Sequence, residues 1–170
     1  MPVFISHKKQ DLHTAQYIQR LLTLNDIESY LDITDPESMK ADNITEVITR
    51  NIKKSTHLIA VISDITQQSW WVLFEIGEAT IAEKRIATYH IGSVKLPEYL
   101  ENWPAMKRQS ELDLFISAYK EEYNTGKQIA GVERFATNRQ GIFESASQGT
   151  IGPDAFHRNL KQKLAQSRIF

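Results

Sequence analysis

The chain has 170 residues, of which 41% are hydrophobic and 24% are charged, and its formal net charge at pH 7 is −1. This length is typical of a single domain, and the composition excludes disordered, collagen-like and coiled-coil classes. Cysteine is absent, which excludes disulfides, thiolate metal sites and a cysteine nucleophile.

Two properties bear on where the chain works and what it binds. Its longest apolar runs, Leu58–Ile62 and Trp70–Phe74, have five residues each, whereas a membrane-spanning helix needs about 20. The N-terminus has no secretory signal pattern, so we expect a cytoplasmic protein without a membrane partner.

Residues 124–170 carry 7 Lys and Arg against 3 Asp and Glu. Because they lack an aromatic ladder, we interpret them as a solvated surface and expect no nucleic-acid partner.

Strand and helix patterns alternate along the first half of the chain. Short apolar runs predict strands at Val3–Ser6, Ile27–Leu31, His57–Ser63 and Ile86–Ile91. Apolar residues three and four apart predict a helix after each of the first three strands, with start signals at Asp11, at Asn43 with Glu46, and at Ser69. This alternation is typical of a parallel α/β sheet, and the run His57–Ser63 predicts its central strand.

The segments between and after these elements are less regular. Residues 32–42, around Pro36, are polar and too long for a tight turn, which is typical of a functional loop. Residues 112–123 fit a strand or a helix, and residues 154–166 fit a helix. We divide the chain into a domain at residues 1–123 and a partly helical C-terminal extension at residues 124–170, packed on the domain or trailing from it.

Doubly wound sheets bind ligands at the carboxyl ends of their strands, here Ser6–Lys9 after the first strand and Ser63-Asp64 after the third. No glycine precedes Gly77, which excludes the glycine-rich phosphate loops of Rossmann and P-loop proteins. The histidines lack the spacing of a metal site, and no Gly-x-Ser-x-Gly elbow occurs. The acid pair of a receiver domain is also missing after the first strand.

The helix predicted after the central strand carries the best candidate for chemistry. Trp71, Glu75 and Glu78 are spaced four and three residues apart and therefore share one helical face. A carboxylate beside a large aromatic side chain can stabilise developing positive charge or accept hydrogen bonds from sugar hydroxyls. The same spacing also fits an amphipathic helix with two exposed glutamates and a core tryptophan, and periodicity alone leaves both interpretations open.

Four segments, in the correct order, resemble bacterial Toll/interleukin receptor (TIR) domains. They are Val3–Asp11, Tyr30–Asp32, His57–Ser63 and Ser69–Gly77. The resemblance is carried by residues 1–92 and extends to residue 123. Within it, Trp71-x-x-x-Glu75 matches the W-x-x-x-E pattern of the family, whose glutamate is the catalytic residue of NAD-cleaving members.

The resemblance implies a flavodoxin-like three-layer α/β sandwich with a central, mostly parallel five-stranded sheet. It implies a catalytic role for one residue, Glu75, and substrate-binding roles for Ser6, His7, Lys8, Trp71 and Asp35. The loop at residues 32–42 would gate the site, and the basic groups would lie near the dinucleotide phosphates. His7 also fits a simpler role at the strand end, and Asp11 fits a helix cap. We expect no metal and no cofactor, because NAD would be the substrate.

The function implied by the resemblance is that of an NAD glycohydrolase or ADP-ribosyl cyclase. Cleavage of the nicotinamide–ribose bond would yield ADP-ribose, a cyclic isomer or another ADP-ribosyl signal in antiviral defence. The chain resembles the TIR signalling component of Thoeris-like anti-phage systems, in which the product activates a separate effector protein. The family context also implies a homo-oligomer formed through TIR–TIR contacts.

Three other functions stay open at this point. A non-enzymatic TIR scaffold or adaptor would assemble through the loop at residues 32–42 and leave Glu75 solvated. A mimic of host signalling would bind host TIR domains. A nucleoside deoxyribosyltransferase would use a similar fold, with a glutamate on the sugar, and would ignore NAD.

Overall fold

One parallel sheet organises the chain, whose computed structural model describes residues 1–31, 41–66, 69–94, 98–136 and 152–169. Its five strands have the order β2-β1-β3-β4-β5, and each neighbouring pair is parallel. They are β1 (Val3–Ser6), β2 (Ser29–Leu31), β3 (His57–Ile62), β4 (Arg85–His90) and β5 (Ala105–Met106). All six residues of β3 are buried. The parallel α/β sheet and its central strand are therefore confirmed.

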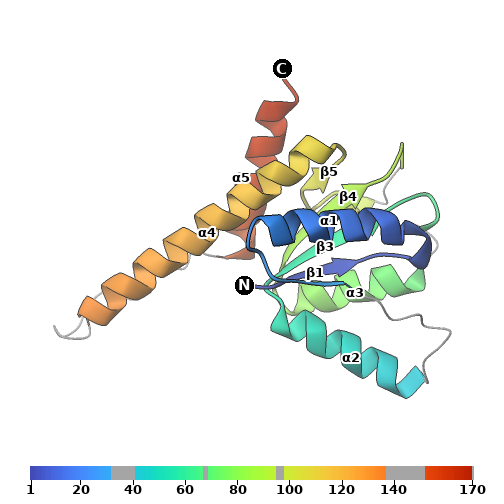
Figure 1. Cartoon of the computed structure of the whole chain (residues 1–170), viewed down its shortest axis with the longest axis horizontal. Helices are drawn as coiled ribbons and strands as arrows, with labels where there is room; N and C mark the ends of the chain where they lie inside the picture. The colour runs from blue at the N-terminus through green and yellow to red at the C-terminus, as the bar shows by residue number, and fades with distance from the viewer. Residues whose placement is uncertain (32–40, 67–68, 95–97, 137–151, 170) are drawn as a thin grey trace.

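Helices cover both faces of the sheet (Figure 1). They are α1 (Leu12–Leu24), α2 (Ala41–Lys54), α3 (Trp70–Ile81), α4 (Gln109–Ala136) and α5 (Pro153–Ser167), with the short 3-10 turns η1 (Lys9–Asp11) and η3 (Glu98–Leu100). Alternate residues of β1 belong to different hydrophobic cores, because successive strand residues point to opposite faces of the sheet. Val3 and Ile5 join the core formed with α1, α4 and α5, whereas Phe4 joins the core formed with α2 and α3.

Several boundaries differ from the sequence prediction. Helix α2 begins at Ala41, so Asn43 lies inside the helix and not at its cap. The ambiguous residues 112–123 are helical and belong to α4, which crosses the boundary expected after residue 123 and continues to Ala136. The resemblance implied a fifth strand, but the position of the two-residue strand β5 was not predicted, because a segment that short shows no periodicity. Among the described residues, no helix is both long enough and apolar enough to cross a bilayer.

Helix α4 is fixed at the amino end of the sheet by a largely buried cluster of ionisable side chains. The Glu122 carboxylate lies 3.1 Å from Nε2 of His57, the first residue of β3, and 2.7 Å from a guanidinium nitrogen of Arg85, the first residue of β4. Burial lowers the pKa of His57. Burial alone would raise the pKa of Glu122, but its contacts with His57 and Arg85 outweigh that effect and lower it. The anchor lies at residue 122, beside the expected domain boundary.

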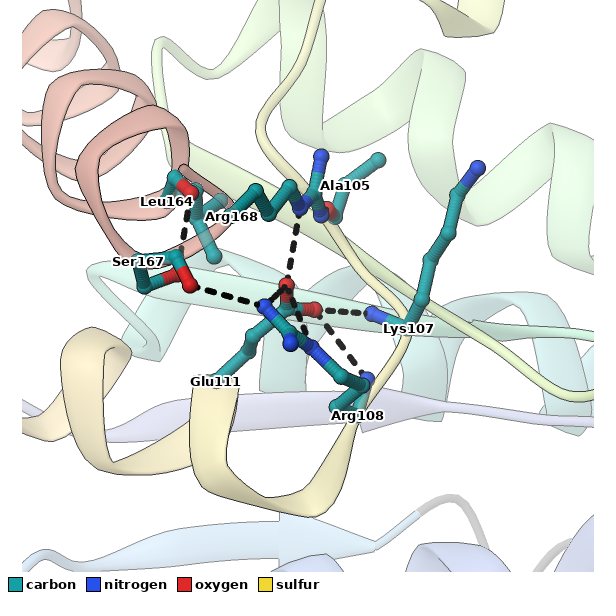
Figure 2. Close-up of polar contacts among 7 residues, drawn as sticks. All are labelled: Ala105, Lys107, Arg108, Glu111, Leu164, Ser167 and Arg168. Carbon is teal, nitrogen blue, oxygen red and sulfur yellow. Dashed lines mark hydrogen bonds and ion pairs between the residues drawn. The ribbon is translucent and has the colours of Figure 1, made fainter. Parts of the chain in front are cut away.

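A second buried carboxylate, Glu111, joins α4 to α5 and β5 (Figure 2). It accepts hydrogen bonds from the backbone N–H groups of Lys107 at 2.5 Å and Arg108 at 3.1 Å, and from Nε of Arg168 at 2.8 Å. Arg168 also donates to the carbonyl oxygen of Ala105 at 2.6 Å. Burial alone would raise the pKa of Glu111, but these donors and the Arg168 charge lower it to about 2. The end of α5 is thereby latched to the core of the domain.

We expect Glu111→Gln to lower the free energy of unfolding by roughly 3 kcal/mol at pH 7, because folding lowers the pKa of this carboxyl from 4.5 to about 2. The unfolded chain takes up the proton first as the pH falls. The stability difference should therefore be constant above about pH 5 and shrink as the pH falls from 4.5 towards 2. Urea unfolding of both proteins between pH 7 and pH 3.5 measures it, and a difference independent of pH would contradict the assignment.

Candidate active site

The geometry of the sheet brings the end of β1 next to α3. Ser6 is the last residue of β1 and lies on the same side as Phe4, which faces α2 and α3. Its Oγ donates a hydrogen bond to Oε2 of Glu75 in the second turn of α3. Both side chains have an exposed fraction of 0%. Two residues that the sequence separates by 69 positions thus form one buried polar pair at the carboxyl edge of the sheet.

Helix α3 directs Glu75, which lies in its second turn, toward the core. Ser69 caps the helix, and its side chain accepts a hydrogen bond from the N–H of Val72 at 3.5 Å, as predicted. The buried residues of the helix are Val72, Glu75, Ile76 and Ala79. A carboxylate among apolar neighbours is unfavourable unless a donor meets it, and Ser6 supplies one. The alternative of an amphipathic helix with exposed glutamates is wrong for Glu75.

The two neighbours of Glu75 on its helical face have structural partners. Trp71 is half-buried and stacks on Phe74, with ring centroids 5.7 Å apart and an interplanar angle of 29°. Glu78 is also half-buried, and its Oε1 accepts a hydrogen bond from the Thr49 hydroxyl of α2 at 2.6 Å. Glu78 thereby ties α3 to α2, a contact that the sequence analysis missed.

Two more of the predicted substrate-binding residues, His7 and Lys8, directly follow β1. His7 is buried immediately after Ser6. Lys8 is half-buried, and its Nζ donates to the carbonyl oxygen of Ile65 at 3.4 Å, so it bridges the loops that follow β1 and β3. Asp35 and most of the predicted gating loop lie outside the described residues.

Asp11 does not cap α1, contrary to the prediction. It occupies the N-cap position but makes no side-chain capping bond. A capping residue has extended backbone angles, whereas Asp11 has φ −95° and ψ 7° because it ends the 3-10 turn η1. Its Oδ2 instead accepts hydrogen bonds from the hydroxyls of Ser63 at 2.7 Å and Thr66 at 2.6 Å. The sequence analysis noted Ser63 at a strand end but missed Thr66.

The predicted site residues that the structure describes are Ser6, His7, Lys8, Trp71 and Glu75, with hydroxyl, imidazole, ammonium, indole and carboxylate groups. Within the described ranges, no cluster of three His, Asp or Glu side chains is placed to hold a metal ion. A buried carboxylate that accepts a hydrogen bond from a hydroxyl can accept the same bond from a sugar hydroxyl, and its charge can stabilise a cation formed beside it. The buried carboxylate at this edge is therefore suited to stabilising positive charge.

A parallel sheet with the strand order β2-β1-β3-β4-β5 and helices on both faces defines a flavodoxin-like class of α/β protein. A sequence profile of the TIR domain matches residues 3–127. The chain belongs to the TIR domain family.

Other comparisons concern the fold. No curated protein sequence matches the chain. Among solved structures, the chain is similar to the 2-deoxyribosyltransferase of the psychrotolerant bacterium Bacillus psychrosaccharolyticus, with a TM-score of 0.57 and 9% sequence identity. The alignment covers 66% of this chain and 90% of that one. At this identity the likeness shows a common fold alone.

We expect a double-mutant cycle to measure the contact between Ser6 and Glu75. Ser6→Ala removes a donor from a buried carboxylate and should lower the free energy of unfolding by about 2 kcal/mol. In the Glu75→Ala background the same substitution should have a smaller effect, with a coupling of about 1–2 kcal/mol. Urea unfolding of the four proteins gives this value. A coupling near zero would show that the two side chains do not interact in solution.

Proposed function

We propose that this TIR protein cleaves the nicotinamide–ribose bond of NAD, with Glu75 as its catalytic carboxylate. The observation that carries the proposal is the buried position of Glu75 at the carboxyl edge of the sheet, with a hydroxyl as its hydrogen-bond partner. This is the glutamate that matches the W-x-x-x-E pattern. The family match supports the proposal as well, because TIR domains include NAD-cleaving enzymes.

Cleavage of the nicotinamide–ribose bond depends mainly on stabilising a ribose cation, and less on proton transfer to the leaving group. When the bond between nicotinamide and C1′ of ribose breaks, the bonding electrons leave with nicotinamide, which becomes a neutral molecule. Positive charge then develops on the ribose ring. A carboxylate held in a low-dielectric site lowers the energy of that state, and a hydrogen bond from a ribose hydroxyl positions the ring. The Ser6 hydroxyl already donates to one oxygen of Glu75, which supports the ability of this carboxylate to accept a bond from a hydroxyl.

The other predicted residues receive supporting roles in this proposal. Lys8 and His7 lie beside Ser6 in sequence and would interact with the dinucleotide phosphates, while Trp71 would pack beside the substrate. Asp35 would act from the gating loop. The cation would be captured by water, by an atom of the same nucleotide or by another nucleophile, giving ADP-ribose, a cyclic isomer or a conjugate. When water reacts, its oxygen bonds to C1′ and its proton passes to solution.

In the cell, we propose that the product is a signal in antiviral defence, as in Thoeris-like systems. A separate effector protein would detect the ADP-ribosyl product in the cytoplasm. TIR domains commonly self-associate, and we propose that this chain works as a homo-oligomer through TIR–TIR contacts. Neither a nucleic acid nor a membrane takes part in this proposal.

We expect Glu75→Gln to slow nicotinamide release from NAD by about 10²–10³-fold, because the amide carries no charge to stabilise the ribose cation. Mass spectrometry of nicotinamide and ADP-ribosyl products, in dilute and in crowded solution, measures the rate and identifies the product. Glu78→Gln is the matched control, since Glu78 lies one turn further along the same helix and binds Thr49. The control should retain activity within about threefold.

The other candidate functions predict different outcomes of the same experiment. If the wild-type protein releases no nicotinamide, even with added lysate of phage-infected cells, the scaffold function is favoured. Base exchange on free deoxynucleosides, with NAD left intact, would favour deoxyribosyl transfer. Equal activities of Glu75→Gln and the wild type would contradict the role of Glu75.

A further inference from the structure

Asp11 is a buried carboxylate that neither the helix beside it nor the proposed reaction uses. Its exposed fraction is 7%, and it makes no capping bond to α1. Burial of a charged group is unfavourable unless hydrogen bonds compensate for the lost water. Its partners must therefore explain why an acid occupies this position.

Those partners lie on the turn that leads from β3 into α3. Ser63 and Thr66 donate their hydroxyls to the same oxygen, Oδ2 of Asp11, at 2.7 and 2.6 Å. The two hydroxyl oxygens lie 2.9 Å apart, and the Thr66 N–H also approaches the Ser63 hydroxyl at 3.3 Å. The three side chains close a compact ring, which we call the Asp11 clamp.

The Asp11 clamp continues into the helix that carries Glu75. The carbonyl oxygen of Thr66 accepts the N–H of Ser69 at 2.8 Å, and Ser69 in turn caps α3. Lys8 adds a second tie between the same two loops through the carbonyl oxygen of Ile65 at 3.4 Å. The clamp therefore fixes the start of α3 relative to the loop after β1.

We propose that Asp11 is a positioning residue for the Ser6–Glu75 pair, acting through Ser63 and Thr66; this rests on the proposed function. Ser6 stands five positions before Asp11, and Glu75 lies six residues after the capping Ser69. At 1.5 Å per residue, Glu75 lies about 9 Å along the helix from Ser69. A small tilt at the start of α3 therefore displaces the Glu75 carboxylate. Displacements of about 1 Å can lower a reaction rate about 10²-fold. Asp11 thus sets the direction in which Glu75 meets its substrate without touching the substrate itself.

The kinetic test compares substitutions within the clamp. Asp11→Asn keeps the shape but loses the charge that holds two hydroxyls, and it should lower kcat for nicotinamide release by about 10–100-fold with KM within about threefold. Thr66→Val, which removes one hydroxyl, should lower kcat in the same way. Thr66→Ser retains that hydroxyl and should restore kcat to within about threefold of wild type.

A matched control separates positioning from general loss of stability. Glu111→Gln removes the charge of another buried carboxylate, in α4 on the face of the sheet opposite to α3. It should leave kcat unchanged at temperatures where the protein is folded. If Asp11→Asn also leaves kcat unchanged, or if its loss of activity equals the unfolded fraction, the positioning role is overturned.

A second readout does not depend on NAD cleavage. Amide hydrogen exchange over Val72–Ile76 should be about tenfold faster in Asp11→Asn than in the wild type, and unchanged in Glu111→Gln, because the clamp restrains local opening of α3. Faster exchange in a protein whose wild type releases no nicotinamide would support the clamp while the proposed function fails. Unchanged exchange would overturn the clamp whatever the activity.

Discussion

The burial of the Glu75 carboxylate at the carboxyl edge of the sheet constrains the strand and the helix that meet there. Glu75 faces the core, so a donor has to reach it from a neighbouring element, and β1 places Ser6 there by ending at that position. The register of the parallel pairing between β1 and β3 fixes where β1 ends along the sheet. Capping by Ser69 and the Asp11 clamp then fix the angle of α3. Sheet, turn and helix thus converge on one hydrogen bond.

Much of the framework follows from local patterns in the sequence. Within the predicted strand His57–Ser63, the residues Leu58–Ile62 are all apolar, as a strand covered on both faces requires, and the central strand β3 contains them. Ser69 precedes an apolar helix at the spacing of a cap, and it caps α3. Glu75 could be singled out because a four-residue spacing from Trp71 is a local signal. Interactions within one helical turn can be predicted from the sequence, because their partners are three or four residues apart.

The rest could not be predicted because it depends on contacts between distant segments. Asp11 has the composition of a cap, but its partners Ser63 and Thr66 lie more than 50 positions away, and no spacing rule connects them. The burial of Glu75 likewise depends on Ser6, which local periodicity cannot detect. The attachment of α4 to the sheet and to α5 likewise depends on distant partners: Glu122 binds His57 and Glu111 binds Arg168, which the sequence of the helix does not specify.

The latch between Glu111 and Arg168 has a consequence for how the protein is made. Synthesis delivers the N-terminal end first, so the whole sheet emerges from the ribosome before Arg168 exists. Until then Glu111 lacks the Arg168 guanidinium, and the apolar face of α4 lacks the side chains that complete its core, Phe156, Leu160 and Leu164. The nascent chain can therefore begin to fold early, but the domain reaches its full stability only after α5 has emerged and Arg168 has bound Glu111.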